Sequence, residues 1–122
     1  MIVILIGYIL FNAVRAVTGP SAFAIYYGLP LANPDNNAFV FVYAIRALFL
    51  GLFGLALLAR RDYKGLALYS LVGSVMPIGD AILVAAQVGG TAIIIRHLLT
   101  ACFLVATWFF MRRWVYSRDT TE

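Results

Sequence analysis

Charged residues are scarce in this sequence. Only 11% of its 122 residues are Asp, Glu, Lys or Arg, whereas 64% are hydrophobic and the mean hydropathy is +0.96. A soluble domain of this size has too high a ratio of surface to volume to bury so much apolar surface. We therefore expect an integral membrane protein whose main contact is the lipid bilayer.

Cysteine and histidine are almost absent, which excludes several kinds of site. Cys102 is the only cysteine, so the chain has no internal disulfide and no metal site built from cysteines. His97 is the only histidine, so a haem held by two histidines of one chain is excluded. Phosphate-binding loops and Ser-His-Asp spacings are also missing, and we predict neither a metal nor a cofactor.

The net charge of +4 does not indicate a nucleic-acid partner, because the basic residues fall at the ends of apolar segments and not on one polar face. Four apolar segments cover residues 1–17, 38–59, 65–88 and 92–110. The last three have about twenty residues each, enough to cross the hydrocarbon core as helices. The sequence predicts a single all-α domain, a bundle of four transmembrane helices.

The link between the first two segments contains Pro20, a residue typical of the first helical turn. Residues 20–27 are apolar enough to form a short interfacial helix or loop after the first span, with Tyr26 and Tyr27 at the membrane interface. The sequence "SAFA" at residues 21–24 resembles a signal-peptidase site. Cleavage there would leave three spans, but we favour an uncleaved helix because no positive charge opens the chain.

Basic residues lie on one side of a four-span arrangement: Arg60, Arg61, Lys64, Arg112 and Arg113. They belong to "RRDYK", between the second and third spans, and to "MRRWVYSRD", after the fourth. By the positive-inside rule this side is cytoplasmic, and both termini lie there. We therefore predict a multi-pass protein whose chain starts and ends in the cytoplasm.

The ionisable residues within the spans share one depth. At 1.5 Å of rise per residue, Asp80 and Arg46 each lie roughly 12 Å below the outer surface. The same calculation places Arg96 and His97 roughly 6–8 Å below that surface, and Arg15 ends roughly 9 Å short of it. The outer half of the membrane thus receives nearly all the charge.

An ionised side chain that faces lipid costs about 2.5–3.5 kcal/mol, so Asp80 is expected to face the bundle interior. There it pairs with a cation or stays protonated. Arg46 is the best partner by depth, and His97, Arg15 or Arg96 are alternatives. A purely structural Arg46–Asp80 pair remains open beside a functional one. Three arginines and a histidine against one aspartate are a surplus of positive charge, which suggests a water-filled pocket, snorkelling to the outer surface, or an anionic or electron-rich ligand.

Two further features extend this polar region. Pro77 cannot donate its backbone hydrogen bond, so with Gly73 and Gly79 it is expected to kink the third helix and open a cavity beside Asp80. Other polar residues lie on the same faces at helical spacing. Our candidate catalytic residues are Asp80, Arg46, His97 and Tyr43, and our candidate substrate-binding residues are Arg15, Asn12, Arg96, Thr100 and Gln87.

This set of residues is sufficient for acid–base chemistry, such as isomerisation, cyclisation or epoxide opening, on a lipophilic small molecule. Asp80 would move the proton and the cationic residues would stabilise a developing alkoxide. The alternative is a non-enzymatic role, as the protomer of a small transporter or as an accessory subunit of a membrane redox or transport complex. A transporter of this size would have to form a homo-oligomer.

Four short motifs resemble an uncharacterised family of small four-helix membrane proteins, which is more loosely similar to the DoxX-like proteins. They are "AFAIYYGLP", "YAIRALFLGL", "MPIGDAILV" and "RHLLTA". The resemblance implies a four-helix bundle and points to Gly28–Pro30, Arg46, Asp80 and His97. Many members carry an acidic residue directly after the arginine, where this chain has Ala47. The resemblance implies no activity.

Overall fold

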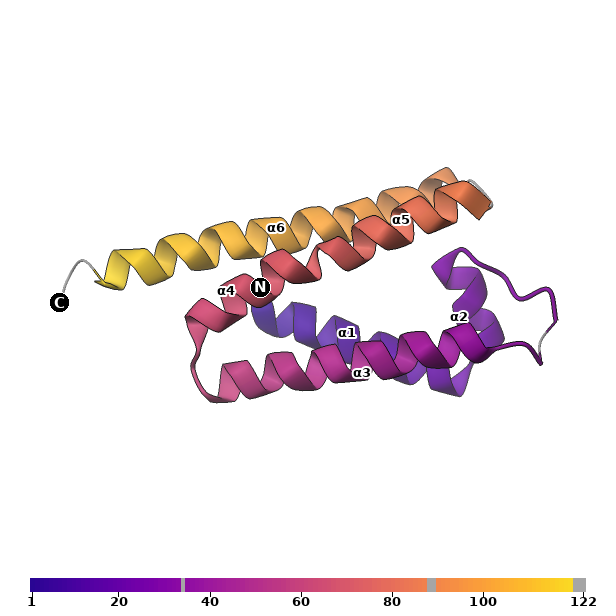
Figure 1. Cartoon of the computed structure of the whole chain (residues 1–122), viewed down its shortest axis with the longest axis horizontal. Helices are drawn as coiled ribbons and strands as arrows, with labels where there is room; N and C mark the ends of the chain where they lie inside the picture. Colours follow the sequence, from indigo (N-terminus) through magenta and orange to yellow (C-terminus); the bar gives the residue numbers. More distant parts are fainter. Residues whose placement is uncertain (34, 88–89, 120–122) are drawn as a thin grey trace.

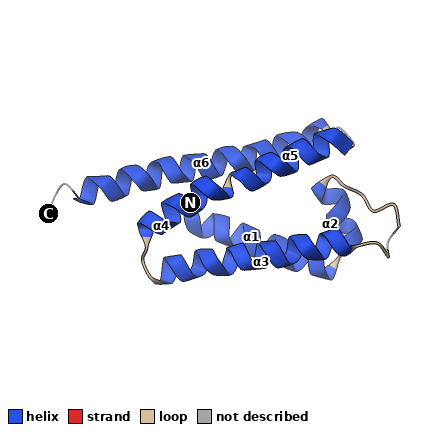
Figure 2. Cartoon of the chain, in the orientation of Figure 1, coloured by secondary structure: helices blue, strands red, loops and turns tan. Residues whose placement is uncertain are grey.

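The computed structural model describes residues 1–33, 35–87 and 90–119, and within these ranges every regular element is a helix (Figure 2). The all-α prediction is confirmed. The helices are α1 (Ile2–Thr18), α2 (Pro20–Tyr27), α3 (Ala38–Ala59), α4 (Tyr63–Gly73), α5 (Val75–Gln87) and α6 (Thr91–Asp119).

The helices form two packed groups. Helix α1 packs along α3, and α4 and α5 pack one after the other along α6. Figure 1 shows α2 turned across the bundle at one end, between the α1–α3 pair and the α5–α6 pair. The carboxyl end of α6 extends beyond the opposite end of the bundle. Helix α2 is therefore placed to close one end of the space between the two groups.

Three stretches are long and apolar enough to cross a membrane: Ala38–Ala59, Tyr63–Gln87 and Thr91–Val115. Helix α1 is also apolar but shorter, with 17 residues. Large apolar side chains point outward on these helices, among them Ile4, Ile45, Ile82 and Leu99, each more than 60% exposed. Such an outer surface suits lipid better than water, in agreement with an integral membrane protein.

Small residues allow α1 and α3 to approach closely. A Cβ atom on Gly51 would lie 2.3 Å from Cδ2 of Leu10, and one on Gly54 would lie 3.0 Å from Cγ1 of Ile6. Ala44 and Ala47 continue this face of α3 and are buried. Close contact of this kind is the usual means of packing apolar helices in lipid, where the hydrophobic effect contributes little.

The third predicted span is interrupted at Ser74, between α4 and α5. Pro77 has no backbone N–H, so the carbonyl of Gly73 receives no helical hydrogen bond from it. The hydroxyl of Ser74 donates to the carbonyl oxygen of Leu71 at 2.6 Å, and the backbone N–H of Ile78 reaches Ser74 only at 3.4 Å. The predicted irregularity is confirmed, and it lies one and a half turns before Asp80.

Helix α6 continues beyond the predicted fourth span. The sequence predicts a span over residues 92–110, and the helix runs from Thr91 to Asp119. Contacts at helical spacing accompany this extension, because the guanidinium of Arg112 lies 5.4 Å from the Trp108 ring centre and that of Arg113 lies 5.1 Å from the Phe109 ring centre. The ring of Trp114 also meets Tyr63 edge-on at 4.9 Å.

Candidate functional site

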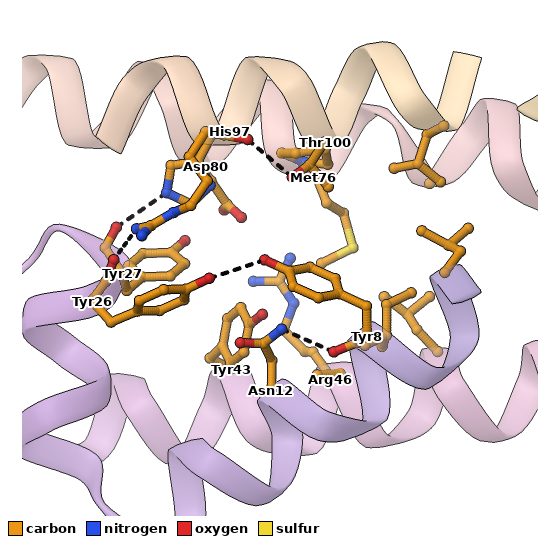
Figure 3. Close-up of a pocket in the computed structure, with 18 of the residues that line it drawn as sticks. Tyr8, Asn12, Tyr26, Tyr27, Tyr43, Arg46, Met76, Asp80, His97 and Thr100 are labelled. Atoms are coloured by element: carbon orange, nitrogen blue, oxygen red, sulfur yellow. Dashed lines mark hydrogen bonds between the residues drawn. The ribbon is translucent and has the colours of Figure 1, made fainter. Parts of the chain in front are cut away.

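A cavity of about 100 Å³ lies between the two groups of helices, beside the interruption of α4 and α5. Its wall is mostly apolar and aromatic. Seven of the nine predicted site residues line it, from the four helices α1, α3, α5 and α6 (Figure 3). These residues are Asn12, Tyr43, Arg46, Asp80, Arg96, His97 and Thr100. The equal depths deduced from residue counting thus correspond to a shared location.

Two predicted site residues do not line the cavity. Arg15 is half-buried and lies next to it, with its guanidinium carbon 4.3 Å from the ring centre of Tyr26, which does line the cavity. Gln87 is exposed near the carboxyl end of α5. It shares a helical face with Asp80, but seven residues of helix displace it by roughly 10 Å along the axis. Gln87 and Asp80 therefore lie on one face of α5, but only Asp80 lines the cavity.

Asp80 and Arg46 face the cavity from opposite sides, α5 and α3 (Figure 3). Among the described residues these two are not joined by an ion pair of 4.0 Å or less. The direct pairing expected from their equal depth is therefore not present, because the cavity separates the two helices. Arg46 keeps an exposed side chain, and Asp80 is half-buried. Both charged groups remain accessible from the cavity.

Tyr27 stands beside Asp80 at the end of α2. Burial raises the pKa of the Tyr27 phenol above its ordinary value of 10, and interaction with the Asp80 carboxyl raises it further. The phenol therefore stays protonated at any physiological pH. It is placed to act as a hydrogen-bond donor toward the Asp80 carboxyl group.

The carboxyl end of α2 is attached to α6 through its backbone. The N–H groups of Gly28 and Leu29 both donate to the carbonyl of Ala24 at 3.0 Å, which closes the helix with a left-handed turn. This turn leaves the last two carbonyls of α2 without helical partners. They accept hydrogen bonds from α6: Arg96 donates to Tyr26, and His97 contacts Tyr27 at 3.1 Å.

The bond from His97 fixes which of its ring nitrogens carries a proton. The carbonyl oxygen of Tyr27 can only accept, so Nε2 of His97 must be the donor. The imidazole ring also stands edge-on to the ring of Tyr27, with 5.2 Å between the ring centres. His97 therefore has a structural task, and only its Nδ1 remains for any proton transfer.

Gly28 permits this close approach of α2. Its φ angle of +104° lies in the left-handed region that side chains disfavour. A Cβ atom at this position would lie 2.7 Å from Cγ2 of Ile93 and 3.1 Å from Cγ1 of Val84. The "GLP" sequence after α2 is thus explained by geometry, as a helix end packed directly against α5 and α6.

Tyrosines form much of the cavity wall, and most of them were not predicted as site residues. Tyr8, Tyr26, Tyr27 and Tyr69 join the predicted Tyr43. Tyr26 and Tyr27 were expected at the membrane interface, but the turned-in position of α2 places them at the cavity. Their amphipathic side chains suit both places equally well, so composition did not distinguish them.

Tyr26 is the centre of a polar and cationic cluster at this end of the cavity. The guanidinium carbon of Arg96 lies 3.8 Å from its ring centre and that of Arg15 lies 4.3 Å from it, within the range of cation–π attraction. Its hydroxyl lies 3.3 Å from that of Tyr8 on α1. Two of the cationic side chains predicted at this depth, those of Arg15 and Arg96, thus make cation–π contacts with Tyr26.

Comparison with known proteins places the chain in a family. The model of a domain of unknown function, DUF4267, matches residues 7–111. The chain belongs to the DUF4267 family. This match overlaps every helix that lines the cavity and confirms the resemblance to an uncharacterised family, whereas it does not test the looser likeness to DoxX-like proteins. Neither the curated proteins nor the solved structures contain a significant match to the chain.

Proposed function

We propose that this DUF4267 protein is a membrane enzyme that performs acid–base chemistry on a lipophilic small molecule held between its two groups of helices. The observation that carries the proposal is the separation of Asp80 from Arg46 across an apolar cavity. A pair whose purpose is to join two helices would close into direct contact, since an unpaired charge in an apolar environment is costly.

The proposed chemistry divides the work between the two walls of the cavity. Asp80 takes a proton from the substrate or returns it, and the protonated phenol of Tyr27 orients the carboxylate. Arg46 stabilises negative charge that develops on a substrate oxygen. In a double-bond isomerisation, Asp80 removes a proton from one carbon and delivers it to another, so that no other reactant is needed. Cyclisation uses the same two groups. Epoxide opening uses them too, and in addition a water molecule or a nucleophilic group of the substrate attacks the ring carbon as its C–O bond breaks.

The size and wall of the cavity favour a small, largely apolar ligand or the reactive end of a longer one. A cavity of about 150 Å³ with apolar walls accommodates benzene, so about 100 Å³ suits a group smaller than one ring unless the walls move. Because the surrounding helices have lipid-like outer surfaces, we place the entry of such a ligand in the bilayer.

We also propose that α1 is the fourth membrane-spanning helix and that both termini face the cytoplasm. The support is its extensive packing along α3, which spans by length and composition, and the basic residues near the α3–α4 turn and the end of α6. With 17 residues α1 is at the lower limit for a span. In this orientation the cavity lies in the outer half of the membrane.

Native mass spectrometry and lipid extraction of the purified protein test the proposal. We expect a lipophilic molecule to accompany the wild-type protein and its occupancy to fall about tenfold or more in Asp80→Asn and Arg46→Gln, the usual loss for hydrogen bonds to charged groups. Asp35→Asn and Arg60→Gln make the same chemical changes at exposed positions outside the cavity and should retain it.

The same molecule then tests for catalysis. In D2O, proton transfer by Asp80 should introduce deuterium into the molecule with the wild-type protein and not with Asp80→Asn. If the molecule binds but takes up no deuterium, the proposed enzymatic activity is contradicted, and a role in binding or transport is left. An empty wild-type protein would contradict the pocket itself and favour the accessory-subunit alternative.

A further inference from the structure

The side chain of Asn12 contains the only buried side-chain oxygen or nitrogen, among the described residues, for which no hydrogen-bond partner is found. Asn12 is 2% exposed and lies on α1, where it lines the cavity. Its Nδ2 donates to the backbone carbonyl of Tyr8 at 2.9 Å, which fixes the orientation of the amide. Its Oδ1 is left with nothing to accept from.

An unsatisfied oxygen in this position is costly. Leaving a buried acceptor unpaired costs about 1–3 kcal/mol, and leucine at the same place would avoid that cost in an apolar wall. The other buried polar side chains of the described residues, Ser70, Ser74 and Thr107, each donate to a backbone carbonyl about one turn earlier in the chain. Asn12 differs from them because it lines the cavity and because one of its two polar atoms has no partner.

The remaining polar groups at the cavity divide into acceptors and donors. Oδ1 of Asn12 can only accept, whereas the guanidinium of Arg46 can only donate. Figure 3 shows Asn12 and Arg46 on the same side of the cavity, opposite Asp80. A ligand that satisfies this side therefore presents a donor to Asn12 and an acceptor to Arg46. A hydroxyl group does both, whereas a ketone, an ether or a hydrocarbon has no donor.

We infer that the ligand of this pocket is a lipophilic alcohol or phenol whose hydroxyl group donates a hydrogen bond to Oδ1 of Asn12. The inference rests on the proposed ligand pocket and adds the chemical class of the ligand. It assigns Asn12 a positioning role, because the residue orients a hydroxyl group and exchanges no proton with it. The proton chemistry of Asp80 takes place on the opposite side of the cavity.

2-Butanol and 2-butanone are a suitable pair of probes, because both are smaller than a six-membered ring, they have the same number of non-hydrogen atoms and only the alcohol carries a donor. Their binding constants are obtained from the rise in the melting temperature of the full chain in lipid nanodiscs with probe concentration. We expect 2-butanol to bind the wild-type protein roughly fivefold more tightly than 2-butanone, as one net hydrogen bond implies.

The variant Asn12→Leu should reduce this preference to about one and should be at least as stable as the wild type without a probe. Thr107→Val removes a buried, satisfied hydroxyl away from the cavity and should leave the preference unchanged. If Asn12→Leu does not fold, the side-chain carbonyl ¹³C resonance of Asn12 in the wild-type protein replaces it as the readout. That resonance should shift with 2-butanol and not with 2-butanone.

Equal binding of both probes to the wild-type protein would overturn the inference and assign Oδ1 of Asn12 to a water molecule. A preference for the alcohol that persists in Asn12→Leu would overturn it as well. In both cases the proposed pocket would stand, because the probes still bind and the losses in Asp80→Asn and Arg46→Gln are measured independently. Binding of neither probe would overturn the inference together with the pocket.

Discussion

At the scale of single residues, Arg96 and His97 show how polar groups within lipid acquire partners. Both use the backbone carbonyls at the end of α2, where the helix leaves its last acceptors free and where its dipole attracts positive charge. Residue counting predicted that both residues lie near the other ionisable groups, and both do line the cavity. It did not predict these hydrogen bonds. The partner was missed because a backbone carbonyl has no signature in the sequence.

Gly28 provides a test at this scale. We expect Gly28→Ala to lower the free energy of unfolding by about 1–3 kcal/mol, because alanine is strained at a positive φ angle and its Cβ would collide with Ile93. Thermal unfolding in detergent measures this loss. Gly7→Ala on α1 is the matched control, because a Cβ there has no neighbour within 4 Å and should be tolerated. Equal stability of the two variants would contradict the packing of the α2 end.

At the scale of elements, the interruption between α4 and α5 connects the backbone to the cavity. Gly73, Met76, Pro77 and Asp80 all line the cavity, and all lie within two turns of this interruption. The sequence predicted this feature well, because a proline has one unambiguous effect on a helix. The inward position of α2 was not predicted, because it depends on contacts between helices far apart in the chain.

Pro77→Ala tests whether the interruption keeps the cavity open. The new N–H can donate to Gly73, so we expect a continuous helix, a gain in stability on the order of 1 kcal/mol and a lower occupancy by the co-purifying molecule. Gly79→Ala should also raise stability by about 1 kcal/mol, since a Cβ there meets open space, but without loss of occupancy. Unchanged occupancy in Pro77→Ala would show that the cavity stays open without the interruption between α4 and α5.

At the scale of the whole molecule, the scarcity of charge predicted an all-helical membrane protein, and the three long apolar stretches agree with it. Because a charge in lipid is costly, the sequence was enough to predict that Asp80, Arg46 and Arg96 lie near one another, and all three line one cavity. The cost of charge in lipid did not predict that tyrosines line the cavity, because tyrosine is common both at membrane surfaces and in protein interiors.

The proposed orientation is tested with single cysteines in a Cys102→Ser background. Ser117→Cys, near the end of α6, should be protected from a membrane-impermeant maleimide in intact cells, whereas Asn36→Cys, before α3, should react almost completely. Both positions are exposed in the folded chain, so membrane sidedness and not burial decides the result. The reverse labelling pattern would place the termini outside and the cavity in the cytoplasmic half.

The attachment of α2 to α6 through carbonyl oxygens has a consequence for how the protein tolerates change. On the α6 side the link depends on the identity of two side chains, but on the α2 side it depends only on the backbone path. A library of substitutions should therefore be asymmetric: positions 96 and 97 should accept few replacements. The exposed positions Ser21, Ala22 and Ile25 of α2 should accept many, provided that the helix persists.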